Sequence, residues 1–468
     1  MKRISTKLLC LFVALTISVS ISGCKNIEDP KGGDVASTPV ATSVPVSTSE
    51  PDITSAPLAT SEPDVVSLPD STSASTEIPT LKMWNPDLDF DIEIRSMMIG
   101  AIRAAEEKFN VKIEETETER ERYRLKIKDA MTTKGGPDIF YTWSSDFSQP
   151  LVNAGKVLAL DQYLGEAKDK LLTGITDNFT YDGKVYGVPY EIQVAPLFCN
   201  IELFEKYNVK IPETYEDLLT AVGTFSENGV TPIICGAKDF WPAMFYYNVL
   251  ALRTAGSDLC NEALSGKISF DSPEFIDAAE KLVELSEAGA FGANPISVSW
   301  DSANVGFAEG KAAMHFNGNW VANNLSSEIS KVNGKITARK FPIIEGGKGS
   351  ATQYLGGAYD GYMINSQTKD PELAAKVLLF ICERVAHDMY ESNLCLPGWK
   401  VQVDESKILP LNKEIFDMTK DSTGWTLWWD VKLEPENAHI HKTLVIELLD
   451  GQITPEKFVK EMKKINEN

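Results

Sequence analysis

The sequence has few of the residues that metal or redox chemistry requires. Only four His occur, and the seven Cys show no CxxC spacing. A zinc site needs three or four neighbouring Cys, His or carboxylate ligands, and His439 and His441 have no third ligand close to them in the sequence. The HExxH, GxSxG and GxxxxGK[ST] motifs are absent as well. We therefore expect no metal, no cofactor and no catalytic residues.

Basic residues are also scarce relative to acidic ones. The chain carries 45 Lys and Arg against 67 Asp and Glu, a net charge of −22 with a pI near 4.7. Binding to nucleic acid requires clustered basic residues that displace counterions, and adhesion to anionic lipid requires the same. The composition argues against both partners and is typical of a soluble extracellular protein.

A long apolar run occurs at the N-terminus, from Leu8 to about Ile21, after the basic residues Lys2, Arg3 and Lys7. The run ends in Ser22-Gly23-Cys24, which resembles the bacterial lipobox, where signal peptidase cuts before an acylated cysteine. We expect a signal peptide over 1–23 and lipidation of Cys24, with membrane contact through the lipid only. The alternatives are a signal peptide with a chance cysteine or a transmembrane helix, for which the run is short.

Residues 24–80 are rich in Ser, Thr and Pro and repeat themselves, as in ATSVPVSTSEPDITSAPLATSEPD. Such a segment cannot bury enough apolar surface to offset the entropy of ordering, so we expect a disordered tether. Beyond it, Cys199, Cys235 and Cys382 lie in apolar runs and are predicted to be small buried hydrophobic residues. A bridge between Cys260 and Cys395 is neither supported nor excluded.

The folded part is predicted to begin with a strand at 81–84 and an amphipathic helix over about 90–109. A strand over 111–115, a charged helix ending near Thr133 and a strand within 135–143 follow, which is the alternation of a parallel sheet. Helical patterns occur further along, over 215–225, 242–254, 274–288 and 371–386. Near the C-terminus, one helix ends at Gly451 and another begins at Thr454-Pro455.

The order of several segments resembles the family-1 extracellular solute-binding proteins, the carbohydrate receptors of bacterial ABC importers. These segments are GGPDIFY, DGKVYGVPYE, LFCNIELFEKYNVKIPETYEDLLTA, FAEGKAAMHFNGNW, DPELAAKVLLFI and LLDGQITPEKFVKEM. The resemblance implies the type II periplasmic-binding-protein fold, an α/β fold of two lobes, each a mixed sheet flanked by helices, with a hinge between them. It places residues 81–193 and 357–398 in lobe 1 and residues 194–356 and 399–468 in lobe 2, with crossings near Gln193 and Gly357.

Aromatic residues at strand ends are the main candidates for ligand contact. Ligands of open α/β sheets bind outside the carboxyl ends of the strands, and Trp84, Trp143 and Trp320 each close a predicted strand. An indole face can stack on the C–H face of a pyranose, while amides and carboxylates bind its hydroxyls. The full predicted set is Trp84, Asn85, Trp143, Asp146, Glu191, Asp239, Trp241, Asn319, Trp320, Asp360, Trp399 and Trp428. Of Trp425, Trp428 and Trp429, we expect one or two to pack in the core.

The resemblance implies a monomeric receptor that is not an enzyme. It would stand on the outer face of the cytoplasmic membrane of a Gram-positive cell, capture an oligosaccharide of plant or starch origin and deliver it to ABC permease subunits. Several indoles favour a di- to tetrasaccharide over a monosaccharide. Two rivals stay open: a paired-carboxylate glycoside hydrolase, which would also have Trp and acids in a cleft, and a receptor for a non-sugar solute.

Overall fold

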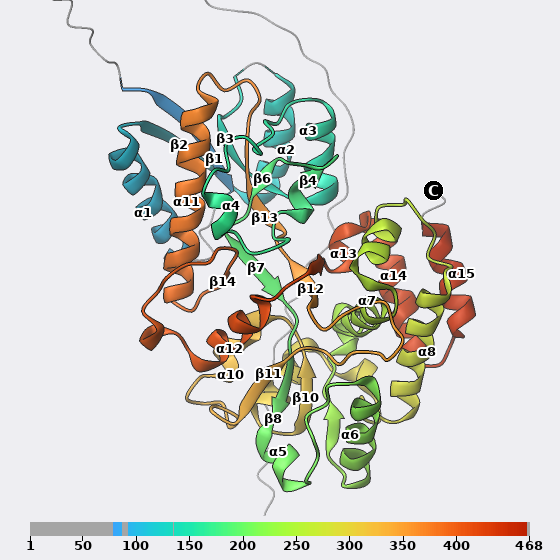
Figure 1. Cartoon of the computed structure of the whole chain (residues 1–468). Coiled ribbons are helices and arrows are strands. Elements are labelled where there is room, and N and C mark those ends of the chain that lie inside the picture. The colour runs from blue at the N-terminus through green and yellow to red at the C-terminus, as the bar shows by residue number, and fades with distance from the viewer. Residues whose placement is uncertain (1–77, 87–91, 134, 466–468) are drawn as a thin grey trace, which may run out of the picture. The chain divides into compact units, whose positions relative to one another are not determined.

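The computed structural model describes residues 78–86, 92–133 and 135–465. The predicted signal peptide, Cys24 and most of the predicted tether lie outside these residues. Among the helices described, none has both the length and the apolar character needed to cross a membrane. The described residues form a mixed α/β fold with three sheets of four or five strands and one small hairpin, arranged as in Figure 1.

Lobe 1 is built on a five-stranded sheet in the order β2-β1-β3-β13-β6. β1 runs parallel to β2 and β3, whereas β13 is antiparallel to both β3 and β6. Helix α1 buries Met98, Ile102 and Ala105, the helical spacing seen in the sequence, and lies beside α11 (Figure 1). The elements are β1 (Thr80–Pro86), α1 (Ile92–Phe109), β2 (Lys112–Thr118), α2 (Arg120–Thr132), β3 (Ile139–Trp143), α3 (Gln149–Asn153), α4 (Ala167–Lys170), β4 (Thr180–Tyr181), β5 (Lys184–Val185), β6 (Gly187–Val188), β13 (Asp360–Ile364) and α11 (Pro371–Glu391).

Lobe 2 is built on a four-stranded sheet in the order β11-β8-β10-β9. Helix α6 begins with a capping box in which Thr214 and Asp217 bond each other's backbone N–H groups. Helix α7 runs ten residues beyond the predicted end at Thr254, with a kink at Gly256. The elements are β8 (Leu197–Asn200), α5 (Ile201–Lys206), α6 (Tyr215–Glu227), β9 (Thr231–Ile233), α7 (Trp241–Leu264), α8 (Pro273–Glu287), α9 (Trp300–Ala308), β10 (Ala312–Phe316), α10 (Ala322–Leu325), β11 (Ile336–Arg339), α13 (Trp429–Lys432), α14 (Pro435–Leu449) and α15 (Pro455–Ile465).

A third sheet, β14-β7-β12-β15, contains both predicted crossings. Its strands are β7 (Glu191–Val194), β12 (Gln353–Gly357), β14 (Leu396–Pro397) and β15 (Gly424–Thr426). Gln193 and Gly357 are direct partners in the antiparallel pairing of β7 with β12 (Figure 1). The two segments therefore pass between the lobes side by side.

The apolar core forms two clusters whose boundary differs from the predicted lobe boundary. The first cluster fills lobe 1 and continues onto lobe 2 strands through Phe198, Ala312 and Ala338. Helix α12 (Pro410–Thr419), which we assigned to lobe 2 within 399–468, buries Ile415 and Phe416 in this first cluster and also contacts β11. The assignment of all of 399–468 to lobe 2 therefore needs correction, because α12 packs on both lobes.

Candidate functional site

Three indoles form a partly exposed row on lobe 2. Trp320 follows β10, Trp241 is the first residue of α7, and Trp300 is the first residue of α9. The ring centroids of Trp241 and Trp320 are 6.2 Å apart, and those of Trp241 and Trp300 are 5.9 Å apart. Trp241 therefore links the other two, and we call Trp300, Trp241 and Trp320 the aromatic row. Trp320 keeps 38% of its surface exposed.

The aromatic row rests on a buried layer of rings. Phe245 stacks on Trp428 with a centroid distance of 4.6 Å and an angle of 12°, and it contacts Trp241 at 5.1 Å. Trp428 is only 6% exposed and meets Trp320 edge-on at 5.6 Å. Trp428 therefore packs against the buried side of the aromatic row. Trp425 and Trp429 are buried too, so all three indoles of the GWTLWWD segment pack in the core, where we expected one or two.

Two neighbours fix the Trp320 side chain. The indole folds back over Gly318, where an added Cβ would lie 2.2 Å from the ring, so only glycine allows this position. The side-chain oxygen of Asn319 accepts the Val194 N–H at 2.9 Å, which ties the loop to crossing strand β7. Asn319, predicted to contact ligand, thus uses its oxygen within the protein. The GNW segment positions the ring against the hinge.

The lobe 1 indoles have their faces covered by basic side chains. Trp143 is fully buried, with the Arg124 guanidinium 4.0 Å from its ring centroid and Phe147 at 4.9 Å. Trp84 is partly buried, and Lys126 Nζ lies 4.4 Å from its ring centroid. Both cations come from α2, and each makes a cation–π contact. Trp143 therefore has no exposed ring face, and a charged side chain lies over the Trp84 ring, in contrast with Trp320.

Two further predicted residues are internal. Asn85 accepts a hydrogen bond from the Tyr362 hydroxyl at 2.8 Å and donates one to Glu115. Burial raises the pKa of the Glu115 carboxyl, and the bond from Asn85 opposes that shift. Trp399 is fully buried and donates its indole N–H to the Pro189 carbonyl at 2.8 Å. We therefore leave Asn85 and Trp399 out of the candidate site.

The predicted acids occupy different settings. Glu191 is partly buried on β7, where it raises the pKa of the Cys395 thiol, although burial of that thiol has the larger effect. Asp360 is partly buried on β13, directly opposite Trp143 of β3. Asp239 is exposed and accepts the Trp300 backbone N–H at 2.6 Å. The side chain of Asp146 lies outside the described residues.

A buried polar network lies behind the aromatic row. His315 Nδ1 is 3.0 Å from the Ile234 carbonyl, and its Nε2 is 2.9 Å from the side-chain oxygen of Asn304. That oxygen also accepts the Asn317 amide at 3.0 Å. Burial lowers the pKa of His315 to about 4, so the ring is neutral near pH 7. The network joins α9 to the loop that carries Trp320.

The remaining Cys residues and His441 are mostly buried, whereas His387 lies 2.9 Å from Asp388. Cys199, Cys235 and Cys382 are buried as predicted, and Cys260 and Cys395 are free thiols. His441 stacks on Trp429 at 5.0 Å, whereas His439 is exposed. No group of three His, Cys, Asp or Glu residues in the described part of the chain is placed to hold a metal ion.

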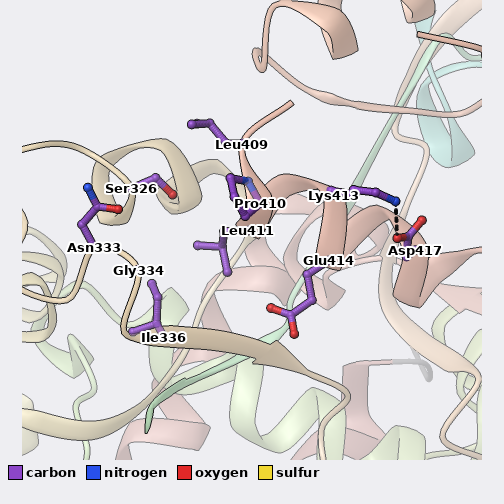
Figure 2. Close-up of a pocket in the computed structure, with 10 residues that line it drawn as sticks. All are labelled: Ser326, Asn333, Gly334, Ile336, Leu409, Pro410, Leu411, Lys413, Glu414 and Asp417. Atoms are coloured by element: carbon purple, nitrogen blue, oxygen red, sulfur yellow. Dashed lines mark hydrogen bonds and ion pairs between the residues drawn. The ribbon is translucent and has the colours of Figure 1, made fainter. Parts of the chain in front are cut away.

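A separate hollow of about 530 Å³ lies beside α12 (Figure 2). Its charged groups already have partners, since Lys413 pairs with Asp417 at 2.8 Å and Glu414 pairs with Arg339. Its lining residues are Ser326, Asn333, Gly334, Ile336, Leu409, Pro410, Leu411, Lys413, Glu414 and Asp417. None of the predicted ligand residues is among them. The hollow is therefore distinct from the aromatic row and less suited to a ligand.

Two aromatic residues in or next to the aromatic row were not predicted from the sequence. Trp300 follows Ser299, whose side chain accepts the Ser302 N–H and so begins α9. Phe240 precedes Trp241, is 39% exposed and has a left-handed backbone with φ of 66°. The position of Trp300 in the sequence could have indicated it, because Trp300, like Trp241, is the first residue of a helix that follows an irregular segment.

Comparison with known proteins gives a consistent answer. The family model described as bacterial extracellular solute-binding protein matches residues 99–381. An uncharacterised ABC transporter extracellular-binding protein of Pyrococcus horikoshii is 28% identical over 262 residues, covering 53% of this chain and 59% of the relative. The multiple sugar-binding protein of Streptococcus mutans is 25% identical over 254 residues, covering 51% and 58%. The matched segments thus span less than two thirds of these relatives.

Solved structures match nearly the whole folded part. A structure from work on xylan utilization by the thermophilic bacterium Caldanaerobius polysaccharolyticus is 42% identical, with a TM-score of 0.65, and the match covers 82% of this chain and 99% of that one. The bacterial solute receptor AcbH is 15% identical with a TM-score of 0.75 over 84% and 99%, which shows the shared type II fold. Since the family model covers more than half of the sequence, the chain belongs to the bacterial extracellular solute-binding proteins.

Proposed function

We propose that this protein captures a xylan-derived oligosaccharide outside the cell and delivers it to the permease of an ABC importer, without chemical change to the sugar. The observation that carries the proposal is the 42% identity to a protein studied for xylan utilization, over 99% of that protein's length. A di- to tetrasaccharide fits this assignment. Starch-derived glucans and mannans are the other ligand classes that we considered.

The aromatic row supports a sugar ligand. Trp320 exposes an apolar ring, and Trp241 and Trp300 continue the row at centroid spacings near 6 Å. Flat apolar rings stack on the C–H faces of pyranoses and exclude water from them. Glu191 and Asp360 are the nearest predicted acids to the crossings and are our candidates for binding hydroxyl groups. A row of rings favours a chain of sugars over one ring.

Closure of the lobes would couple capture to delivery. The crossing strands β7 and β12 join the lobes, and Asn319 bonds β7 directly next to Trp320. A ligand that contacts both lobes binds the closed form better and so shifts the equilibrium towards it. The permease would then recognise the closed form. This coupling predicts that ligand changes the distance between labels placed on the two lobes.

One experiment separates the proposal from its rivals. The protein is titrated by calorimetry with xylo-oligosaccharides, maltodextrins, manno-oligosaccharides, chitin oligosaccharides and free xylose, and each mixture is then checked by chromatography for new products. We expect heat of binding with xylo-oligosaccharides and no product. Product formation would indicate a glycoside hydrolase. Binding to none of these sugars would indicate a receptor for another solute.

We also propose that Cys24 is acylated and that the mature protein is held as a monomer on the outer face of the cytoplasmic membrane. The Ser22-Gly23-Cys24 sequence supports this anchor. Mass spectrometry of the N-terminal peptide from native membranes should find a lipid on Cys24. The Cys24→Ser variant should leave the membrane fraction, and a variant that stays bound would argue for a different anchor.

A further inference from the structure

The aromatic row extends beyond the residues that the sequence singled out. Trp241 contacts Trp320 at an interplanar angle of 57° and Trp300 at an interplanar angle of 49°, so it is the middle ring of the three. Trp300 is partly buried, packs against the first core cluster and lies at the end of the row away from Trp320. Resting on the proposed function, we propose that Trp300 contacts the distal sugar of longer oligosaccharides and that Asp239 is the positioning residue that holds it.

The loop before α7 holds Trp300 in place through hydrogen bonds to its backbone and to the segment before it. Asp239 accepts the Trp300 N–H at 2.6 Å, and the Lys238 N–H donates to the Val298 carbonyl at 3.0 Å. An added Cβ on Gly236 would lie 2.6 Å from the Trp300 Cα, so the two backbones are in direct contact there. The segment that carries Trp241 therefore sets the position of Trp300. Asp239 was predicted to contact ligand, but one of its carboxylate oxygens accepts the Trp300 N–H instead.

The buried polar network connects α9 by hydrogen bonds to the loop that carries Trp320. Asn304 lies one turn after Trp300 on α9, and its side-chain oxygen accepts the Asn317 amide, which also lies 2.9 Å from His315 Nε2. Asn317 in turn accepts the Gly318 N–H at 2.8 Å, and Gly318 lies directly under the Trp320 ring. Both ends of the aromatic row are thus connected through one set of hydrogen bonds. Fixed spacing between rings removes the cost of ordering them when a sugar binds.

A fixed row makes affinity depend on ligand length in a defined way. A disaccharide can occupy Trp320 and Trp241 without reaching Trp300, whereas a longer chain reaches the third ring. Each added aromatic contact should lower the dissociation constant by roughly tenfold, which corresponds to about 1.4 kcal/mol. Trp300 should therefore determine the preference for long over short oligosaccharides.

The test is calorimetry on the whole mature protein with xylobiose, xylotriose, xylotetraose and xylopentaose. Trp300→Ala should weaken binding of the longest ligands by about tenfold to a hundredfold and leave xylobiose within about twofold. Trp300→Phe, which keeps a smaller ring, should show a smaller loss with the same dependence on length. This second variant also keeps the test valid if the alanine variant fails to fold.

Asp239 is tested by a matched pair of variants. Asp239→Ala removes the acceptor for the Trp300 N–H and should reproduce the length-dependent loss, at about three- to tenfold. Asp239→Asn keeps an acceptor oxygen and should restore binding. Asp301→Ala changes an exposed acid next to Trp300 on α9 and should have no effect at any ligand length.

Equal loss of affinity at all ligand lengths, or no loss, in the Trp300 variants would overturn the inference while the sugar receptor stands. A wild-type protein that binds no sugar would overturn both.

Discussion

Indoles in the two lobes have similar places in the sequence but different surroundings. Trp143 ends a strand of lobe 1 and Trp84 lies two residues before the end of another, which continues to Pro86, while Trp320 follows a strand of lobe 2. In lobe 1, Arg124 and Lys126 cover the rings at 4.0 and 4.4 Å. In lobe 2, Trp320 meets the rings of Trp241 and Trp428 at 6.2 and 5.6 Å and is 38% exposed.

The difference shows that a strand end alone does not make a platform. Helix α2 follows β2 with a run of basic residues, and its side chains reach the lobe 1 rings. Among the described residues, cation–π contacts involve Trp84 and Trp143 of lobe 1 but none of Trp241, Trp300 and Trp320 of lobe 2. Lobe 1 indoles are therefore expected to contribute to stability, and lobe 2 indoles to affinity. Four predictions test this division.

Replacing Trp143 with Ala should have the largest effect on folding. The ring is fully buried between Tyr123, Tyr141 and Phe147, so its removal leaves a cavity and an uncovered Arg124. We expect a loss of about 3 to 5 kcal/mol in the free energy of unfolding, measured by urea titration. Trp320→Ala is the matched control and should lose less than about 1 kcal/mol. Similar losses in both variants would remove the contrast between the lobes.

Acid should weaken lobe 2 before lobe 1. The two buried histidines of the described chain, His315 and His441, both lie in lobe 2, and burial lowers their pKa values to about 4 and about 3. Between pH 6.5 and 4 the unfolded chain binds protons that the native chain does not, so stability falls as pH falls. Two such groups predict a loss on the order of 2 to 4 kcal/mol between pH 7 and pH 5.

Hydrogen exchange followed by peptide mass spectrometry can locate this loss. After correction for intrinsic exchange rates, peptides of β10 and α14 should lose protection at pH 5, and peptides of β1 and β3 should keep it. His441→Gln removes one titrating ring beside the Asn248 amide, which lies 3.0 Å away, and should make the dependence on pH shallower. Equal loss of protection in both lobes would mean that other groups control the acid response.

Trp320 should matter for affinity more than for folding. Trp320→Ala is expected to weaken oligosaccharide binding by roughly tenfold to a hundredfold, equivalent to about 1 to 3 kcal/mol, with little change in melting temperature. Gly318→Ala offers a finer change, because its methyl group would displace the ring without removing it. Calorimetry and thermal melting on both variants check the prediction. A large fall in melting temperature with affinity retained would identify Trp320 as a core residue.

Sequence patterns predicted the elements that local chemistry determines. The helical pattern over 215–225 corresponds to α6, and Thr454-Pro455 begins α15, as expected. The alternation of strands and helices from β1 to β3 also followed from patterns along the chain, whereas the crossings near Gln193 and Gly357 were implied by the resemblance. In each case, the signal lies within a few residues of the feature.

The covering of each indole could not be predicted in this way. The N–H of Trp399 finds the Pro189 carbonyl 210 residues away, and Lys126 reaches Trp84 from a different element. Such contacts depend on how elements pack, which periodicity does not specify. The same reason explains why α12 was assigned to one lobe only and why Trp300 was overlooked, since its neighbours Asp239 and Trp241 are about sixty residues distant in sequence.

The smallest expected effect concerns the cover on Trp84. Lys126 Nζ lies over the Trp84 ring and donates to the Thr118 hydroxyl at 3.0 Å, on a partly exposed surface. Lys126→Met keeps the length of the side chain and removes the charge, so the cost should be about 0.5 to 1 kcal/mol of stability. Because we assign Trp84 to structure, affinity for oligosaccharide should stay within about twofold, as in Arg122→Met, the exposed control on α2. A tenfold change in affinity for Lys126→Met alone would place Trp84 on the binding surface and give lobe 1 a share in stacking the sugar.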